Sequence, residues 1–230
     1  MNLTRPVDIY CERLEPGFWA EPANALTNIA FILAAVLAWR LAGRQGVRDP
    51  ALAVVIGLAA LVGVASFLFH TFAVAWAGAA DMGSIGLFML GASYLALRRL
   101  FGFAPIWIFA GATGFAGAWF LSGALWPGGI GGAFAALGGS GLYGLGIAIL
   151  ATFALMLALR GCPAWKSIAA AGAVFLLSLY FRTIDGRICA TFPLGAHFLW
   201  HLLNGFMFWI ILRALIVHGR RPDRIAGDAR

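Results

Sequence analysis

The sequence predicts an all-α membrane protein, with seven transmembrane helices in a single domain over residues 1–230. The first reason is composition: 62% of the residues are hydrophobic and 11% are charged, whereas soluble domains carry about 25% charged residues. The second is that the apolar residues gather in runs that approach the ~20 residues needed to cross a bilayer. The third is that basic residues lie at the ends of these runs, where they orient membrane proteins.

The apolar runs define the elements in order, with ends uncertain by ~2–4 residues. A glycine-rich stretch over residues 122–141 fits a loop, a re-entrant piece or the start of the fifth helix. Residues 1–23 form an acidic segment before the first span, and residues 218–230 form a basic tail. The expected spans are Ala25–Leu41, Ala51–Phe69, Met82–Leu97, Ala104–Leu121, Gly138–Leu159, Ser167–Phe181 and Ala196–Val217.

The basic residues divide unequally between the two sides of such a bundle. Seven spans place the termini on opposite sides, and one side then carries only Arg5, Arg13, Arg182 and Arg187, while the other 12 of the 16 basic residues lie on the second side. The positive-inside rule therefore places the C-terminus in the cytoplasm and the acidic N-terminal segment outside. The net charge of +7 reflects this orientation, so we expect no nucleic-acid partner. The Arg- and Ala-rich composition favours a bacterial inner membrane.

Few acidic or histidine side chains lie within or at the ends of the expected spans. They are His70 at the end of the second span, Asp81 beside the third, and His197 and His201 at the start of the seventh, and Ser66 lies one helical turn before His70. In the orientation derived from Arg and Lys alone, all five lie near the outer face. Because ionisable groups inside a membrane are costly and usually functional, their convergence predicts a site at that level.

The histidines have the spacing of metal ligands. His197 and His201 are four residues apart, which places both imidazoles on one face of a helix, and His70 supplies a third. Three histidines and one water make the open tetrahedral arrangement of a catalytic zinc. The competing interpretation is that the pair only hydrogen-bonds backbone groups and His70 only packs. Asp81 has three readings: a fourth ligand, a proton shuttle or a helix N-cap.

Three motifs resemble those of the alkaline ceramidases. The first runs from Asp8 to Glu12 and from Glu21 to Asn28, the second from Ser66 to His70 with Asp81 eleven residues on, and the third from Ile184 to Cys189 and from His197 to Gly205. The same Ser, Asp and three-His pattern marks a wider superfamily that includes the adiponectin-type receptors. The acidic N-terminus and the Cys-Glu pair favour the ceramidase branch.

The resemblance implies Zn²⁺ on His70, His197 and His201, with Ser66 and Asp81 acting beside the metal. It also implies a Ca²⁺ near the N-terminus, held by the candidate ligands Asp8, Glu12 and Glu21, although Asp8 stands one residue further from the cysteine than in the family pattern. The resemblance and the oxidising outer compartment together predict a Cys11–Cys189 disulfide, with Cys162 left as a cytoplasmic thiol.

These observations predict a zinc-dependent hydrolase that cleaves the amide of a membrane lipid, ceramide or a related N-acyl lipid. The alternative from a different class is a seven-helix receptor or lipid-binding protein that keeps the zinc for structure. A transporter is disfavoured because the fourth to sixth spans offer almost no polar residues through the depth of the bilayer. The lipid head group, the chain length and the oligomeric state are not readable from the sequence.

Overall fold

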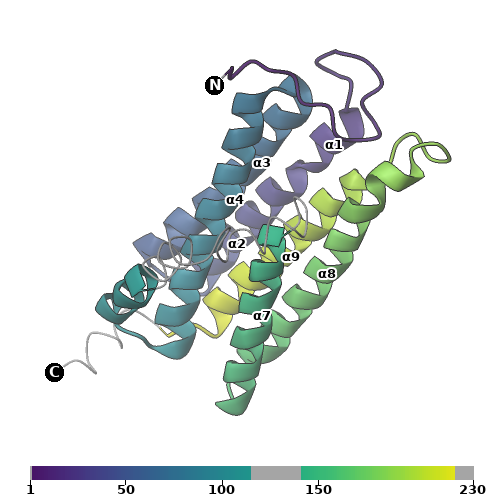
Figure 1. Ribbon diagram of the computed structural model, residues 1–230. Coiled ribbons are helices and arrows are strands. Elements are labelled where there is room, and N and C mark those ends of the chain that lie inside the picture. Colours follow the sequence, from purple (N-terminus) through teal and green to yellow (C-terminus); the bar gives the residue numbers. More distant parts are fainter. Residues whose placement is uncertain (1, 115–140, 221–230) are drawn as a thin grey trace.

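The computed structural model describes residues 2–114 and 141–220, and these residues form a helical bundle (Figure 1). No β-strand is present in this part of the chain. Besides the named elements, residues 105–114 are helical. The named helices are α1 (Pro22–Thr27), α2 (Ile29–Arg44), α3 (Pro50–Phe72), α4 (Ala75–Ala96), the π-helical turn η1 (Leu97–Phe101), α7 (Gly141–Leu159), α8 (Ala164–Ile188) and α9 (His197–Val217).

Among the described residues, five helical stretches are long and apolar enough to cross a membrane, which confirms the all-helical class and indicates an integral membrane protein. They are Pro22–Arg44, Pro50–Phe72, Ala75–Phe101, Ala164–Ile188 and His197–Val217, and Tyr143–Leu159 is a shorter apolar helix. Residues 115–121 of the expected fourth span and residues 138–140 of the fifth lie outside the described residues. The total of seven spans and the orientation of the termini therefore stay predictions.

Helix α9 holds the bundle together, since it packs against α1, α2, α4 and α8. Against α2, Gly205 lies directly beside Ala30 and its backbone, so that even a methyl group at Gly205 would clash. Small residues allow such close packing in membranes, where there is no hydrophobic force between helices. This contact fixes the start of α9 against the α1–α2 region.

The third span begins at Ala75 and not near Met82, as the sequence analysis expects. From the sequence, the helix is expected to begin after Asp81, because a carboxylate is costly in lipid. The side chain is buried inside the protein, and the helix continues past it. The N-terminal segment covers this region, because Val7 donates its N–H to Ala73 O at 2.8 Å and Ala75 donates to Arg5 O at 3.0 Å.

A buried ion pair closes the end of the bundle opposite the N-terminal segment. Arg99 is fully buried and donates from Nη1 to Asp49 Oδ2 at 2.8 Å. The other oxygen of Asp49 caps α3 by accepting the N–H of Ala51 at 3.0 Å, and Arg220 N–H donates to Arg99 O at 2.9 Å. The Asp49 carboxylate therefore links the start of α3 to the η1 turn, and the backbone oxygen of Arg99 links that turn to the chain beyond α9.

We expect Asp49→Asn to destabilise the protein by about 3–5 kcal/mol, because it leaves the buried Arg99 charge without its counter-charge. Asparagine caps a helix about as well as aspartate, so the substitution removes the ion pair and keeps the cap. Thermal or denaturant unfolding in detergent measures the change. The exposed neighbour Arg48 gives the control Arg48→Gln, with an effect within ~0.5 kcal/mol. Equal stability of the two variants would contradict the assignment.

Candidate metal centre

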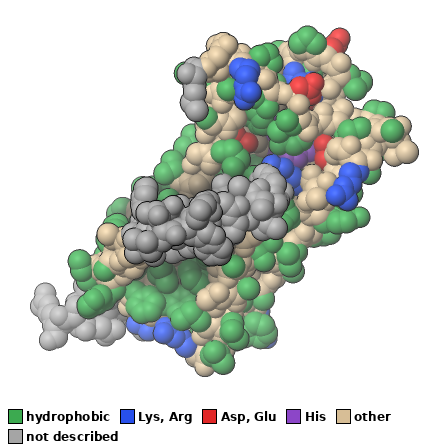
Figure 2. All heavy atoms as spheres, in the orientation of Figure 1, with side chains coloured by type: hydrophobic (Ala, Val, Ile, Leu, Met, Phe, Trp, Pro, Cys, Tyr) green, Lys and Arg blue, Asp and Glu red, His purple; other side chains and the backbone are tan. Residues whose placement is uncertain are grey.

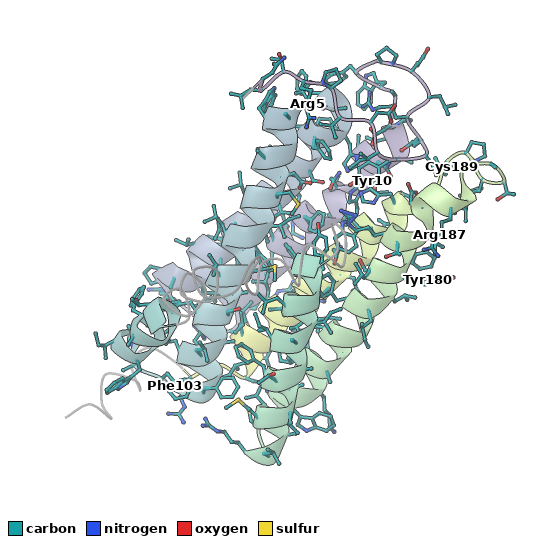
Figure 3. The ribbon with its side chains drawn as sticks, viewed as in Figure 1. Arg5, Tyr10, Phe103, Tyr180, Arg187 and Cys189 are labelled. Carbon is teal, nitrogen blue, oxygen red and sulfur yellow. A yellow bond between two sulfur atoms is a disulfide. The ribbon has the colours of Figure 1, made fainter. Side chains whose placement is uncertain are left out.

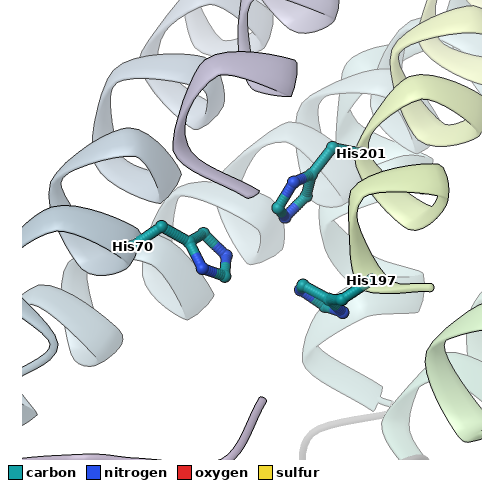
Figure 4. Close-up of side chains that lie close together, drawn as sticks. All are labelled: His70, His197 and His201. Carbon is teal, nitrogen blue, oxygen red and sulfur yellow. The ribbon is translucent and has the colours of Figure 1, made fainter. Parts of the chain in front are cut away.

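The three predicted histidines converge on one point inside the bundle (Figure 4). His70 lies in the last turn of α3 and His197 is the first residue of α9, with His201 one turn further on. One ring nitrogen from each lies within 4.8 Å of the others, and each residue is 1–2% exposed. This is the only such group of His, Cys, Asp or Glu side chains within residues 2–114 and 141–220, so the prediction of a three-histidine cluster is confirmed.

The outer nitrogens of two imidazoles are held by polar side chains. Glu21 Oε2 accepts a hydrogen bond from His70 Nδ1 at 2.6 Å, and Thr27 Oγ1 lies 3.1 Å from His201 Nδ1. Metal-bound histidines almost always have such a partner on the second ring nitrogen. These bonds leave Nε2 of His70 and His201 for a ligand.

The third imidazole carries an atom that lacks a partner. His197 Nδ1 is buried and makes no hydrogen bond, although buried polar atoms are nearly always satisfied. An unsatisfied ring nitrogen beside two oriented imidazoles fits a bound metal ion. Nitrogen donors in threes, with a position left open, are typical of zinc, and the identity of the metal stays a prediction.

Glu21 connects the cluster to the N-terminal segment. Its second oxygen accepts from Arg13 Nε at 2.5 Å, and Arg13 Nη2 also donates to the backbone oxygen of His70 at 3.3 Å. Burial raises the pKa of Glu21, but the hydrogen bonds and charges of His70 and Arg13 outweigh burial and hold the pKa below its ordinary value. The carboxylate is therefore ionised and accepts hydrogen bonds only.

Asp81 and Ser66 lie beside the histidines, as expected. A cavity of about 190 Å³ is lined by both side chains and by His197 and His201, and the Ser66 hydroxyl lies next to the Asp81 carboxylate. The N-cap of α4 is Val74, which removes the N-cap reading of Asp81. Asp81 Oδ1 is buried without a hydrogen-bond partner, so one carboxylate oxygen is free to accept a proton or hydrogen bond inside the cavity.

The predicted Cys11–Cys189 disulfide is present, and Cys162 is a free, half-buried cysteine. The disulfide joins the N-terminal segment to the loop between α8 and α9, at the end of the bundle where Figure 3 places Tyr10 and Cys189. Tyr10 stacks on the ring of His197, with centroids 3.7 Å apart and an angle of 22° between the planes. Burial raises the pKa of Tyr10 above its ordinary value, so the ring is a neutral wall of the cavity.

Asp185 positions the start of α9, a role that the sequence analysis did not assign. Its Oδ1 accepts the N–H groups of Ala196 and His197 at 2.7 and 3.0 Å, and its Oδ2 accepts the N–H of Cys11 at 3.1 Å. Gly195 has a left-handed φ of 68°, and a side chain there would collide with Asp185 and Cys11. The signal available in the sequence was an acidic residue near the end of an apolar run.

The three candidate calcium ligands make other contacts. Glu12 accepts the N–H groups of Ala23 and Asn24 at 2.6 and 2.8 Å and so caps α1 from a distance. Burial raises the pKa of Glu12, and these two donors act against that rise. Glu21 is engaged by Arg13 and His70, and Asp8 is exposed. The structure does not bring the three into one ligand group, and the calcium site stays a prediction.

Arg182 is a further cavity residue that the sequence analysis treated only as a topology marker. Its guanidinium carbon lies 5.1 Å from the ring centroid of Tyr143 and 5.5 Å from that of Trp200. All three residues line the same cavity as Asp81.

The histidine atoms are visible in the upper half of Figure 2, with basic and acidic side chains beside them.

Comparison with known proteins yields no match to any protein-family model and no match to a curated protein. The fold and the site define an integral membrane protein of the helical type with a cluster of three buried histidines that could hold a metal ion. The resemblance to the alkaline ceramidases stays an expectation drawn from the motifs.

We expect the purified protein to hold about one zinc ion per chain, and His70→Ala or His201→Ala to lose it with the helical fold retained. The metal content by elemental analysis and the helix content by circular dichroism test this. His218→Ala is the matched control, because His218 follows the end of α9 and lies outside the cluster. Normal metal content in both ligand variants would refute the assignment.

We expect Glu21→Gln to weaken metal binding by roughly 10–100-fold, the range found when the partner of a ligating histidine is removed. Glutamine keeps the shape but loses the charge that orients His70. Competition with a chelator of known affinity measures the change. Glu15→Gln, at an exposed position of the same segment, is the control, and equal affinities would show that Glu21 serves only the N-terminal segment.

Proposed function

We propose that the protein is a metal-dependent hydrolase that cleaves the amide bond of a membrane lipid, ceramide or a related N-acyl lipid. One observation carries the proposal: an unpartnered carboxylate oxygen of Asp81 lies in the same cavity as His197 and His201. A purely structural metal site is usually closed by its protein ligands, and it has no use for a costly buried carboxylate beside it.

The groups present supply the parts of amide hydrolysis. His70, His197 and His201 would hold the zinc ion, which would supply Lewis acidity to polarise the substrate carbonyl and to make hydroxide available near pH ~7. Asp81 takes the proton from the attacking water as the new C–O bond forms at the acyl carbon. It then gives this proton to the amine nitrogen as the C–N bond breaks. The products are a fatty acid and a free amine.

Ser66 acts on the charge that develops during the attack. Its hydroxyl donates one hydrogen bond, either to the carbonyl oxygen as that oxygen becomes negative or to the neighbouring Asp81 carboxylate. The first use stabilises the transition state, and the second orients the proton shuttle. Both roles depend on the buried position of Ser66 in α3, one helical turn before His70.

The acyl chain has an apolar cavity beside the polar one. Phe31, Ile85, Tyr143 and Trp200 line both cavities, so the two spaces adjoin. The second cavity extends between the helices and is lined mostly by Phe, Ile, Leu, Met and Ala side chains. If the acyl chain of the lipid lies among these residues, its amide group lies in the polar cavity beside the histidines. Hydrolysis of the amide needs this arrangement.

The proposed setting is a bacterial inner membrane with the cavity towards its outer face. The distribution of basic residues supports this orientation, and the disulfide supports an oxidising compartment on the side of the N-terminal segment. A lipid of the outer leaflet then enters sideways between the helices. Zinc is the proposed metal, because three histidines suit it.

Incubation of the purified protein with ceramide and other N-acyl lipids tests the proposal. The expected result is release of fatty acid that stops on chelation and returns when zinc is added. A protein that binds these lipids and zinc, but releases no fatty acid from any of them, is instead the receptor or lipid-binding protein of the alternative.

We expect Asp81→Asn to retain zinc and the fold while reducing the rate of hydrolysis by ~10²–10⁴-fold, because the proton shuttle is lost. Ser66→Ala should also retain zinc, with a loss of ~10²–10³-fold if Ser66 alone serves the oxyanion and less if the metal shares that task. Rates and zinc content are measured on the same preparations, with the exposed-site variant Glu15→Gln as control. A fully active, zinc-loaded Asp81→Asn protein would exclude the shuttle role.

A further inference from the structure

Arg182 is a half-buried cation that lines the polar cavity. Two arginines with buried side chains are each paired with a carboxylate, Arg13 with Glu21 and Arg99 with Asp49. Within residues 2–114 and 141–220, no ion pair joins Arg182 to a carboxylate, and its Nε is buried without a hydrogen-bond partner. An unpaired charge in such a place is costly, and amide hydrolysis as described makes no use of it.

The aromatic neighbours hold Arg182 in place without neutralising it. Its guanidinium lies over the rings of Tyr143 and Trp200, which is favourable for a cation but leaves the Nε–H group without a hydrogen-bond partner. Guanidinium N–H groups lie in the plane of the group and match the two oxygens of a carboxylate. The arrangement is therefore that of a receptor for a planar anion.

The charges of the cavity favour the same ligand. Asp81 and Arg182 are the charged side chains among its lining residues, and their formal charges cancel. Neutral histidines with a divalent metal ion would leave the cavity with a charge of two positive units. In surroundings of low dielectric such an excess attracts an anion strongly.

We propose that Arg182 binds a carboxylate on the polar end of the substrate, so that the preferred lipid is an N-acyl amino acid rather than a neutral ceramide. The inference rests on the proposed function and specifies its substrate class. Water adds to the acyl carbon, the C–N bond breaks, and the products are the fatty acid and the free amino acid. The proton passes from the water to the amine nitrogen, so Arg182 takes no part in bond making.

The position of Arg182 suits the head group better than the acyl chain. It lies six residues before the end of α8 at Ile188, towards the end of the bundle that carries the N-terminal segment. Figure 3 shows Tyr180, Arg187 and Cys189 along this part of α8. The apolar cavity that suits the chain is lined by Tyr143 and Trp200 but not by Arg182.

Two lipids that differ only in the head group test the inference. N-palmitoylglycine carries a carboxylate where N-palmitoylethanolamine carries a hydroxymethyl group, and both have the same acyl chain and amide. We expect the wild-type ratio of kcat/KM to favour N-palmitoylglycine. In Arg182→Gln this ratio should fall by roughly 10–100-fold, the value of a charge-assisted bidentate contact, with most of the change in KM. Arg182→Lys keeps the positive charge but cannot make the two parallel hydrogen bonds of a guanidinium. Its kcat/KM ratio should lie between those of the wild type and Arg182→Gln.

The control variant is Arg187→Gln on the same helix. Arg187 is exposed, so removal of its charge changes the net charge equally and should leave the ratio as in the wild type. Melting temperatures of all variants show whether they are folded. If Arg182→Gln does not fold, Arg182→Lys decides alone, and a wild-type ratio in that variant overturns the inference.

The fatty acid product also carries a carboxylate. A second measurement shows whether Arg182 binds the carboxylate of the substrate or that of the product. If Arg182→Gln weakens inhibition by free palmitate and leaves the substrate ratio unchanged, Arg182 serves the product and the inference is overturned. Equilibrium binding of N-palmitoylglycine to metal-free protein is independent of turnover. Binding that is weakened by Arg182→Gln supports the inference even if no lipid is hydrolysed, a result that would sink only the proposed function. Equal binding by both proteins overturns the inference.

Discussion

The carboxylate of Asp185 fixes the geometry on which the metal centre depends. Three backbone N–H groups, those of Cys11, Ala196 and His197, converge on its two oxygens. The first residues of a helix have no intrahelical partner for their N–H groups, and here a carboxylate from α8 accepts two of them. The ring of His197 is thereby set at the start of α9, opposite His70 on α3. Any displacement of α9 would separate its two histidines from the third.

The N-terminal segment is part of the site and not an extension of the bundle. It contributes the ring of Tyr10 against His197, the Arg13 contact to Glu21 and a cap for α1 through Glu12. Glu21 in turn orients His70. Metal affinity in proteins depends on such outer partners nearly as much as on the ligands. Of the acidic residues in this segment, Glu21 orients an imidazole and Glu12 caps α1, whereas Asp8 and Glu15 are exposed.

The features that sequence reasoning found are those set by local spacing. His197 and His201 share a helix face because they are four residues apart, and Ser66 and His70 share one for the same reason. The ends of the apolar runs also predicted that these four residues lie at the same depth in the membrane. Asp185, Tyr10 and the Glu21–His70 contact depend on how segments about 50 to 180 residues apart in the sequence fold onto each other, which no periodicity encodes. The start of the third span was missed because a buried carboxylate resembles a helix boundary in sequence.

The disulfide has a consequence for the order in which the protein is made. Cys11 and Cys189 are 178 residues apart, and His197 and His201 follow the second cysteine. During synthesis the N-terminal segment emerges first, yet its disulfide partner Cys189 and two of the three histidines are added only after α8 has been translated. A nascent chain that has not reached His201 lacks a complete ligand set. The first turns of the last helix therefore complete the three-histidine cluster, so a chain that ends before α9 cannot form this candidate metal site.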